Sequence, residues 1–279
     1  MNHWIQPSIP TVTEVISQMR NLVRLDRLET LRHKEKQAKG FFRKWKLFIT
    51  THMSRAEIIE LVTPFRLFPD VGGGYFLPRL PGKIGLFIAL TGFRLKGRDV
   101  QKAGIATHFV DSQKIPSLEK DLITLKCPSK EDIIDVLNAY HNESSASEDL
   151  PFILAECLDK INSLFSGNSV EEIIDNLKQD GSPFANQQLK ILSKMSPTSL
   201  KITFRQLKNG SSLTLQEVLT MEYRLSQASM SGHDFYEGVR AMLIDKDQNP
   251  KWKPEELKEV TDKYLDSCFA SLGGRDLIL

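Results

Sequence analysis

A regular series of helix-capping signals, repeated along the chain after residue 67, constrains the fold more than any other feature of this sequence. A Ser, Thr or Asp followed three residues later by an acid is typical of a helix N-terminus, because both side chains bond to free backbone N–H groups there. These pairs are Ser129 with Asp132, Ser169 with Glu172, Thr214 with Glu217, and Asp234 with Glu237. They predict a mainly α chain.

Residues that favour the first or last position of a helix support that prediction. Ser196 precedes Pro197, and proline suits the first position of a helix. Glycines are expected where helices end; those placed at such points are Gly92, Gly104, Gly181, Gly210 and Gly232. The pattern predicts about eight helices after residue 70. One short strand is predicted at Ile105–Val110, which is rich in β-branched and aromatic residues.

Composition excludes several classes of protein. The chain has 279 residues, of which 41% are hydrophobic and 26% charged, and this suits one or two soluble globular domains. The net charge of +2 gives no indication of nucleic acid binding. No apolar run reaches the roughly 18 residues that a membrane span needs. Three dispersed cysteines, with no C-x-x-C pair, favour a reducing compartment.

Charge is unevenly distributed. Residues 1–55 hold eleven Lys or Arg against four Asp or Glu, so the rest of the chain is acidic. Apolar residues at helical spacing predict an amphipathic helix from Thr11 to Gln37, and Ser54 with Glu57 predicts a second, short one. The arginines resemble a transit sequence, but the interspersed acids and sparse serines argue against one.

The densest cluster of chemically informative residues is LFPDVGGGYFLPRL, at residues 67–80. Asp70 lies at a turn, and Gly72–Gly74 follow it and open a helix. The free N–H groups of such glycines attract anions or an acyl oxygen. Capping of the helix is the common role of an aspartate in this position; a general acid or base aimed into a pocket is the alternative.

This cluster and three later segments resemble the crotonase (enoyl-CoA hydratase) superfamily. The segments are residues 82–111 (GKIGLFIALTGFRLKGRDVQKAGIATHFVD), 196–208 (SPTSLKITFRQLK) and 234–254 (DFYEGVRAMLIDKDQNPKWKP). The last segment is similar to the 3-hydroxyisobutyryl-CoA hydrolases, and it and Asp70 argue against a hydratase or isomerase. The resemblance covers roughly residues 67–279.

That resemblance implies a fold and an active site. It implies that residues 67–279 are the C-terminal half of a crotonase α/β-spiral fold, with most strands of the spiral missing, and that residues 1–66 are an atypical basic helical segment. Asp70 matches the family's catalytic aspartate. The family's partner glutamate falls at Val62, so its role does not transfer, and the oxyanion-hole loops are expected to be absent. The activity of the chain is therefore in question.

The resemblance also implies the substrate and the cellular setting. The family hydrolyses an acyl-CoA thioester in mitochondrial valine breakdown, and it needs no cofactor because coenzyme A is part of the substrate. Asp70, Gly73 and Gly74 are the substrate-binding candidates. Self-association, or association of a non-catalytic chain with full-length subunits, is an open alternative. None of the six histidines lies at metal-ligand spacing, so no metal site is expected.

Two groups of charged residues are candidates for binding the phosphates of coenzyme A. Glu237, Arg240, Asp245 and Lys246 lie near Trp252, and here an internal ion-pair network is the favoured interpretation. The other group lies nearer the glycine-rich turn, where a solvated helix face is the default interpretation. It consists of Arg79, Arg94, Lys96 and Arg98.

Overall fold

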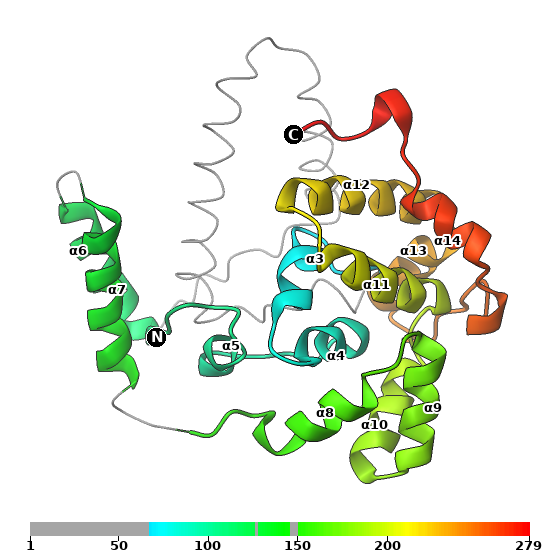
Figure 1. The fold of residues 1–279 in the computed structure, drawn as a ribbon, viewed down its shortest axis with the longest axis horizontal. Coiled ribbons are helices and arrows are strands. Elements are labelled where there is room, and N and C mark those ends of the chain that lie inside the picture. The colour runs from blue at the N-terminus through cyan, green and yellow to red at the C-terminus, as the bar shows by residue number, and fades with distance from the viewer. Residues whose placement is uncertain (1–66, 126–127, 146–149) are drawn as a thin grey trace. The chain divides into compact units, whose positions relative to one another are not determined.

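The computed structural model describes residues 67–125, 128–145 and 150–279, and within these ranges the chain is helical with no β-strand. Figure 1 shows the arrangement of the helices. The α-helices are α3 (Gly73–Phe76), α4 (Ile84–Thr91), α5 (Arg98–Lys102), α6 (Ile115–Thr124), α7 (Lys130–Ser145), α8 (Leu158–Leu164), α9 (Val170–Asp180), α10 (Pro183–Leu192), α11 (Pro197–Gly210), α12 (Leu215–Ser231), α13 (His233–Val239) and α14 (Asp262–Phe269).

Shorter helical turns join these elements. A π-helical turn at Arg240–Ile244 continues α13. The 3₁₀ turns are Leu77–Arg79, Ser112–Lys114, Ala155–Cys157, Leu257–Glu259 and Gly273–Arg275. The prediction of about eight helices was too low for the described ranges. Helices such as α3 and α5, with four and five residues, are too short to show a periodic pattern in the sequence.

Most of the predicted caps are confirmed. At the start of α12, the Thr214 hydroxyl accepts a bond from the N–H of Glu217, and the Glu217 carboxylate accepts one from the N–H of Thr214. Ser129 and Asp132 form the same reciprocal pair before α7. Ser196 caps α11, with Pro197 in its first turn. These side chains supply partners for N–H groups that the helix itself leaves free.

The predicted strand at Ile105–Val110 is wrong: the segment is an irregular connection between α5 and α6. A strand needs a second strand to complete its ladder, and the described ranges hold none. The polar groups bond to α7 instead. The N–H of Phe109 donates to Nδ1 of His141 at 3.0 Å, and Nε2 of His108 lies 3.0 Å from Oδ1 of Asn138.

The largest hydrophobic cluster surrounds α4. Seven of its eight residues are buried, and Phe87 contacts Phe165 edge-to-face with ring centroids 5.2 Å apart. Gly85 allows this helix to approach the preceding turn, since a Cβ there would lie 1.8 Å from the carbonyl oxygen of Leu77. A helix buried on nearly every face has no solvent-exposed polar side, and apart from Thr91, whose hydroxyl donates to the carbonyl oxygen of Phe87, its sequence is apolar.

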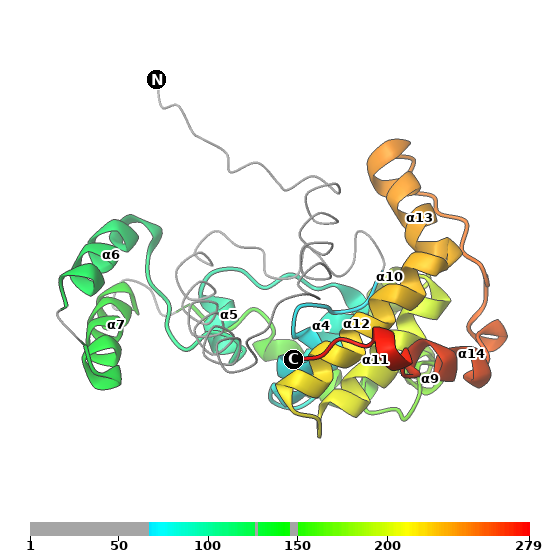
Figure 2. The same ribbon diagram turned by 90° about the horizontal axis from the view of Figure 1, so that it is seen from above.

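Two smaller clusters complete the packing. One, containing Phe68, Val218 and Leu225, joins the start of the described chain to α12 and α14. The other holds α6 against α7 through Leu118 and Leu137, and Figure 2 shows these two helices side by side. Helix α3 packs against both α11 and α12, so residues far apart in the sequence meet at the Asp70 turn.

No helix among the described residues is both long and apolar enough to cross a membrane. The helices predicted at Thr11–Gln37 and after Ser54, and the position of Val62, lie outside the described residues. So does the whole of the basic segment 1–66.

Candidate active site

Asp70 begins a tight turn in which two consecutive residues adopt positive φ. Val71 has φ 53° and Gly72 has φ 86°, and the N–H of Gly73 donates to the carbonyl oxygen of Asp70 at 2.8 Å. Positive φ suits glycine, but a β-branched residue such as valine is strained there. A conformation of this kind persists only where surrounding contacts enforce it.

Glu222 on α12 supplies two of those contacts. Its carboxylate accepts a hydrogen bond from the N–H of Gly72 at Oε2, 2.8 Å, and one from the N–H of Gly74 at Oε1, 2.9 Å. The side chain is 4% exposed. Hydrogen bonds from backbone N–H groups to an ionised carboxylate are stronger than those between neutral groups. The glycine-rich turn is therefore tied to a helix about 150 residues further along the chain.

Gln206 on α11 holds the other side of Asp70. Its Nε2 donates to the carbonyl oxygen of Pro69 and lies 3.3 Å from Oε1 of Glu222. The side chain is fully buried, and its Oε1 is one of two buried side-chain atoms without a hydrogen-bond partner in the described ranges. Asp70 thus sits between two residues, Pro69 and Gly72, that are each bonded to a buried side chain.

Both carboxyl groups at the turn titrate far above their ordinary range. Burial raises the pKa of Asp70 from 3.8 to about 6, although a bond from its own backbone N–H opposes the shift. Burial also raises the pKa of Glu222 from 4.5 to about 7; the bonds from Gly72 and Gly74 lower it, and the charge of Asp70 raises it further. A carboxyl group with a pKa near neutrality is suited to general acid–base chemistry.

The N–H groups of the glycine-rich turn all donate within the protein. Gly72 and Gly74 bond to Glu222, and Gly73 bonds to Asp70. An acyl oxygen would have to displace one of these acceptors, so the geometry gives the glycines a structural role first. Substrate binding by Gly73 and Gly74 stays a prediction.

Arg79 links the residues after the glycine-rich turn to the end of α11. Its guanidinium donates to the carbonyl oxygens of Gly210 at 2.8 Å and Leu213 at 2.9 Å, and it lies over the Tyr75 ring at 3.8 Å. Arg98 donates to the carbonyl oxygen of Ser144. The contacts of Arg79 and Arg98 are those of groups that hold loops together, and phosphate binding by Arg79, Arg94, Lys96 and Arg98 stays a prediction.

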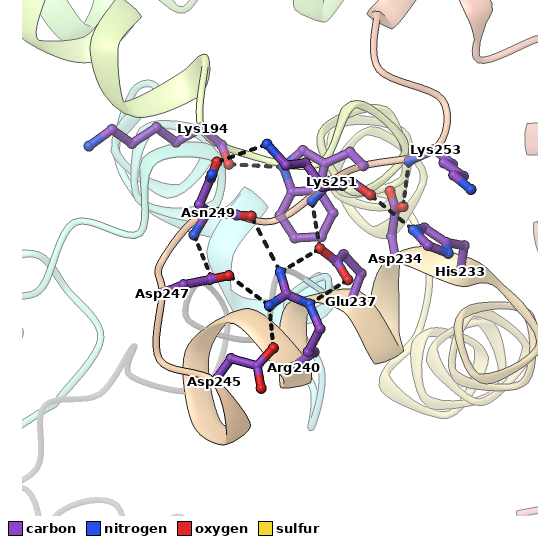
Figure 3. A network of polar contacts seen from close by, with 11 residues as sticks. Lys194, His233, Asp234, Glu237, Arg240, Asp245, Asp247, Asn249, Lys251 and Lys253 are labelled. Carbon is purple, nitrogen blue, oxygen red and sulfur yellow. Dashed lines mark hydrogen bonds and ion pairs between the residues drawn. The ribbon is translucent and has the colours of Figure 1, made fainter.

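A second polar cluster lies at the end of α13, where the sequence favoured an ion-pair network (Figure 3). Arg240 pairs with Glu237 at 2.8 Å, Asp245 at 2.6 Å and Asp247 at 2.7 Å, and it also donates to the carbonyl oxygen of Asn249. Bonds from Arg240 and the N–H of Lys251 lower the pKa of Glu237 to about 2. This network joins Glu237, Arg240 and Asp245 after α13, as expected, and adds Asp247, whereas the exposed Lys246 takes no part in it.

The predicted cap at Asp234 is wrong. Helix α13 begins at His233 with Gly232 before it, so Asp234 is its second residue, and no side chain caps this end. Its carboxylate accepts bonds from the Ser196 hydroxyl at 2.5 Å and the N–H of Lys253 at 2.9 Å. These partners are far away in the sequence, and the capping rule considers only residues within one turn. The rule therefore fails here.

Replacement of Asp234 by alanine is expected to lower the free energy of unfolding by about 2 to 3 kcal/mol, because the buried Ser196 hydroxyl and Lys253 N–H lose their acceptor. Urea denaturation measures the change. Asp245→Ala is the matched control: it removes a half-exposed partner of Arg240 and should change stability by less than about 1 kcal/mol. Equal losses in the two variants would contradict the assignment.

The described residues hold no group of three or more His, Cys, Asp or Glu side chains arranged to bind a metal ion. The chemical groups that meet at the turn are carboxyl, amide and backbone groups. Sequence patterns pointed to Asp70 but missed Glu222 and Gln206, and only the resemblance of residues 196–208 to a family helix marked the neighbourhood of Gln206.

Comparison with known proteins shows which proteins this chain is similar to. Over 217 residues the chain is 74% identical to 3-hydroxyisobutyryl-CoA hydrolase, mitochondrial, of Xenopus tropicalis, covering 78% of this chain and 56% of that protein. The human protein of the same name is 71% identical over 215 residues, with 77% and 56% covered. The chain thus spans a little over half the length of the curated relatives it matches.

Solved structures give the same family. A carnitinyl-CoA dehydratase from Mycobacterium thermoresistibile superposes with a TM-score of 0.66 at 33% identity, covering 76% of this chain and 58% of that one. An enoyl-CoA hydratase from Rhodobacter sphaeroides gives 0.65 at 32%, covering 77% and 60%. The model of the enoyl-CoA hydratase/isomerase family matches residues 51–269. The chain belongs to the enoyl-CoA hydratase/isomerase family, whose fold is that of the crotonases.

Proposed function

We propose that this chain takes part in the hydrolysis of the thioester of 3-hydroxyisobutyryl-CoA, with Asp70 transferring protons at the reacting centre. The observation that carries the proposal is the 71–74% identity to hydrolases of that name over a region that includes the Asp70 turn. The raised pKa of Asp70 supports the assignment, because a carboxyl group that titrates at about 6 can both accept and release a proton near neutral pH.

Several further properties belong to the same proposal. The substrate supplies coenzyme A, so the reaction needs no separate cofactor. The relatives are named as mitochondrial proteins, which supports a mitochondrial location for this chain. The helices from α3 to α14 correspond to the C-terminal half of the crotonase fold, and the share of the relatives' length that the chain covers supports this assignment.

Replacement of Asp70 by asparagine is expected to reduce kcat/KM for 3-hydroxyisobutyryl-CoA by at least about 100-fold, because the amide cannot transfer a proton and general acid–base groups contribute 10²–10⁴-fold. Release of the free thiol of coenzyme A measures the reaction. Asp245→Asn, a change of the same kind on an exposed residue, should leave the rate unchanged. Absence of hydrolysis by the unmodified chain would overturn the proposal.

Hydration of an enoyl-CoA is the second candidate activity, because the family model and both solved structures carry the names of hydratases or dehydratases. The same protein preparation should be assayed with crotonyl-CoA, following the loss of the conjugated double bond by absorbance. Hydration faster than thioester hydrolysis would favour this candidate over the first.

Association with a full-length relative is the third candidate role, since the chain matches only 56% of those proteins. Mixing the tagged chain with an untagged full-length hydrolase tests it. Co-elution at a fixed ratio is the expected result for a subunit role, and separate elution of the two proteins would exclude that role.

A further inference from the structure

We infer that Glu222 is a positioning residue for the catalytic Asp70: it holds the strained turn in the conformation that directs the Asp70 carboxyl group. The inference rests on the proposed role of Asp70. It concerns a side chain on α12, 152 positions away in the sequence, for which the sequence patterns indicated no role.

The first support is geometric. The two bonds from Glu222 end on Gly72 and Gly74, which lie two and four residues after Asp70. Val71 lies between Asp70 and the first of them and carries the strained φ of 53°. A carboxylate that bonds to N–H groups on both sides of Gly73 fixes the direction of the turn, and a positive φ at valine needs such enforcement.

The second support is that the bonds to the turn engage both carboxylate oxygens of Glu222. Both of its oxygens already accept backbone hydrogen bonds, and the side chain is 4% exposed. It therefore cannot act as a nucleophile or a general base without releasing the turn. Gln206 on α11 contributes in the same way. Its side-chain amide donates to the carbonyl oxygen of Pro69, next to Asp70, and lies close to Glu222.

The third support is that Asp70 and Glu222 differ in their exposure to solvent. Asp70 is partly exposed, whereas Glu222 is enclosed. The charge that acts on Glu222 is that of Asp70, and the other group facing it from α11 is the neutral amide of Gln206. The residue Asp70 thus keeps some contact with solvent, whereas the carboxylate of Glu222 is committed to the backbone.

The test measures the titration of Asp70 by ¹³C NMR of its carboxyl carbon in the 279-residue chain. In the unmodified protein the midpoint is expected at about 6. In Glu222→Gln the turn loosens and water reaches Asp70, so the midpoint should fall by at least about one pH unit toward 3.8. The kcat/KM of thioester hydrolysis should fall by about 10- to 100-fold, because a displacement of about 1 Å at a reacting group has that effect.

Glu217→Gln is the matched control. Glu217 lies on the same helix, and its carboxylate also accepts a backbone N–H bond, that of Thr214. Its replacement weakens the cap of α12 but should leave the Asp70 midpoint unchanged. An unchanged midpoint in folded Glu222→Gln would overturn the inference, since a purely stabilising role would give that result.

A measurement on the unmodified chain covers the case in which Glu222→Gln does not fold. The amide proton resonances of Gly72 and Gly74 should shift as Glu222 ionises near pH 7, whereas that of Gly92, which bonds to the carbonyl oxygen of Ile88, should not. Absence of the shift would also overturn the inference. If hydrolysis is absent while the Asp70 midpoint moves as expected, the proposed function fails and the structural relation between Glu222 and Asp70 stands.

Discussion

Replacement of Gly210 by alanine is expected to destabilise the protein by at least about 3 kcal/mol, the upper end of what overpacking usually costs. Gly210 is the last residue of α11, and a Cβ there would lie 2.0 Å from the carbonyl oxygen of Gly74. The obstructing atom belongs to the backbone, so no side-chain rotation can relieve the contact. Helix propensity alone predicts the opposite sign, a gain of about 1 kcal/mol for alanine.

Thermal and urea denaturation measure the effect, with Gly274→Ala as the control. No atom lies within 4 Å of the Cβ that Gly274 would gain, and its replacement should change the free energy of unfolding by less than about 0.5 kcal/mol. Because the obstructed oxygen belongs to the glycine-rich turn, Gly210→Ala should also disturb Asp70. A Gly210→Ala protein as stable as the control would show that α11 and α3 can separate freely.

The free energy of unfolding should decrease as the pH rises from about 4 to about 7, which is opposite to the usual effect of buried salt-bridged acids. Asp70 and Glu222 have folded-state pKa values of about 6 and about 7, above their ordinary 3.8 and 4.5. The folded protein therefore binds more protons than the unfolded chain in this window, and stability falls with pH. A shift of about two pH units corresponds to about 3 kcal/mol for one group.

Asp70→Asn isolates this effect, because asparagine keeps the shape of the side chain without its charge. At pH 4, near the unfolded pKa of 3.8, the variant and the unmodified protein should differ in stability by less than about 1 kcal/mol. At pH 8 the variant should be more stable by about 2 to 3 kcal/mol, since it no longer places a charge in a buried site. Urea denaturation at the two pH values measures the difference, and an equal difference at both would contradict the raised pKa.

The lowered pKa values elsewhere do not obscure this test. Bonds to Arg240 and Lys251 hold Glu237 at a pKa of about 2, and bonds to Arg224 and Ser271 hold Asp276 still lower. Such groups contribute stability that is present above their unfolded pKa and is lost as the pH falls through the folded value. Their effect begins below about pH 5, but it is the same in the unmodified protein and in Asp70→Asn, so it cancels when the two are compared at one pH.

The helix caps could be predicted because the two residues that form each cap lie three positions apart in the sequence. Thr214 with Glu217 and Ser129 with Asp132 are caps of this kind, and Gly92 and Gly181 end α4 and α9 in the left-handed conformation. The mainly helical character of the described residues follows from such signals. They carry no information about which helices pack together.

The contacts of the candidate site and the packing of the helices could not be predicted, because they join residues that are far apart in the sequence. Glu222 appears in the sequence as one acid on an amphipathic helix, and only the fold brings it to Gly72 and Gly74. Asp234 matched the capping pattern but is bound by Ser196 and Lys253. Ile105–Val110 has the residues of a strand but no neighbouring strand in the described ranges. Asp70 was singled out because the residues around it form an unbroken run that resembles the family, and its catalytic role stays a prediction.

The bonds of Asp234 and Glu237 to the backbone of Lys253 and Lys251 close loops of 19 and 14 residues. The entropy of closing a loop grows slowly with its length, by about 0.6 kcal/mol for each doubling. Evolution or design can therefore lengthen this loop at little cost in free energy, provided that both closing bonds and the bonds of Arg240 within the loop are kept. The region after α13 is accordingly a suitable place to insert a peptide tag, whereas the Asp70 turn, fixed at every residue from Pro69 to Gly74 except Val71, is not.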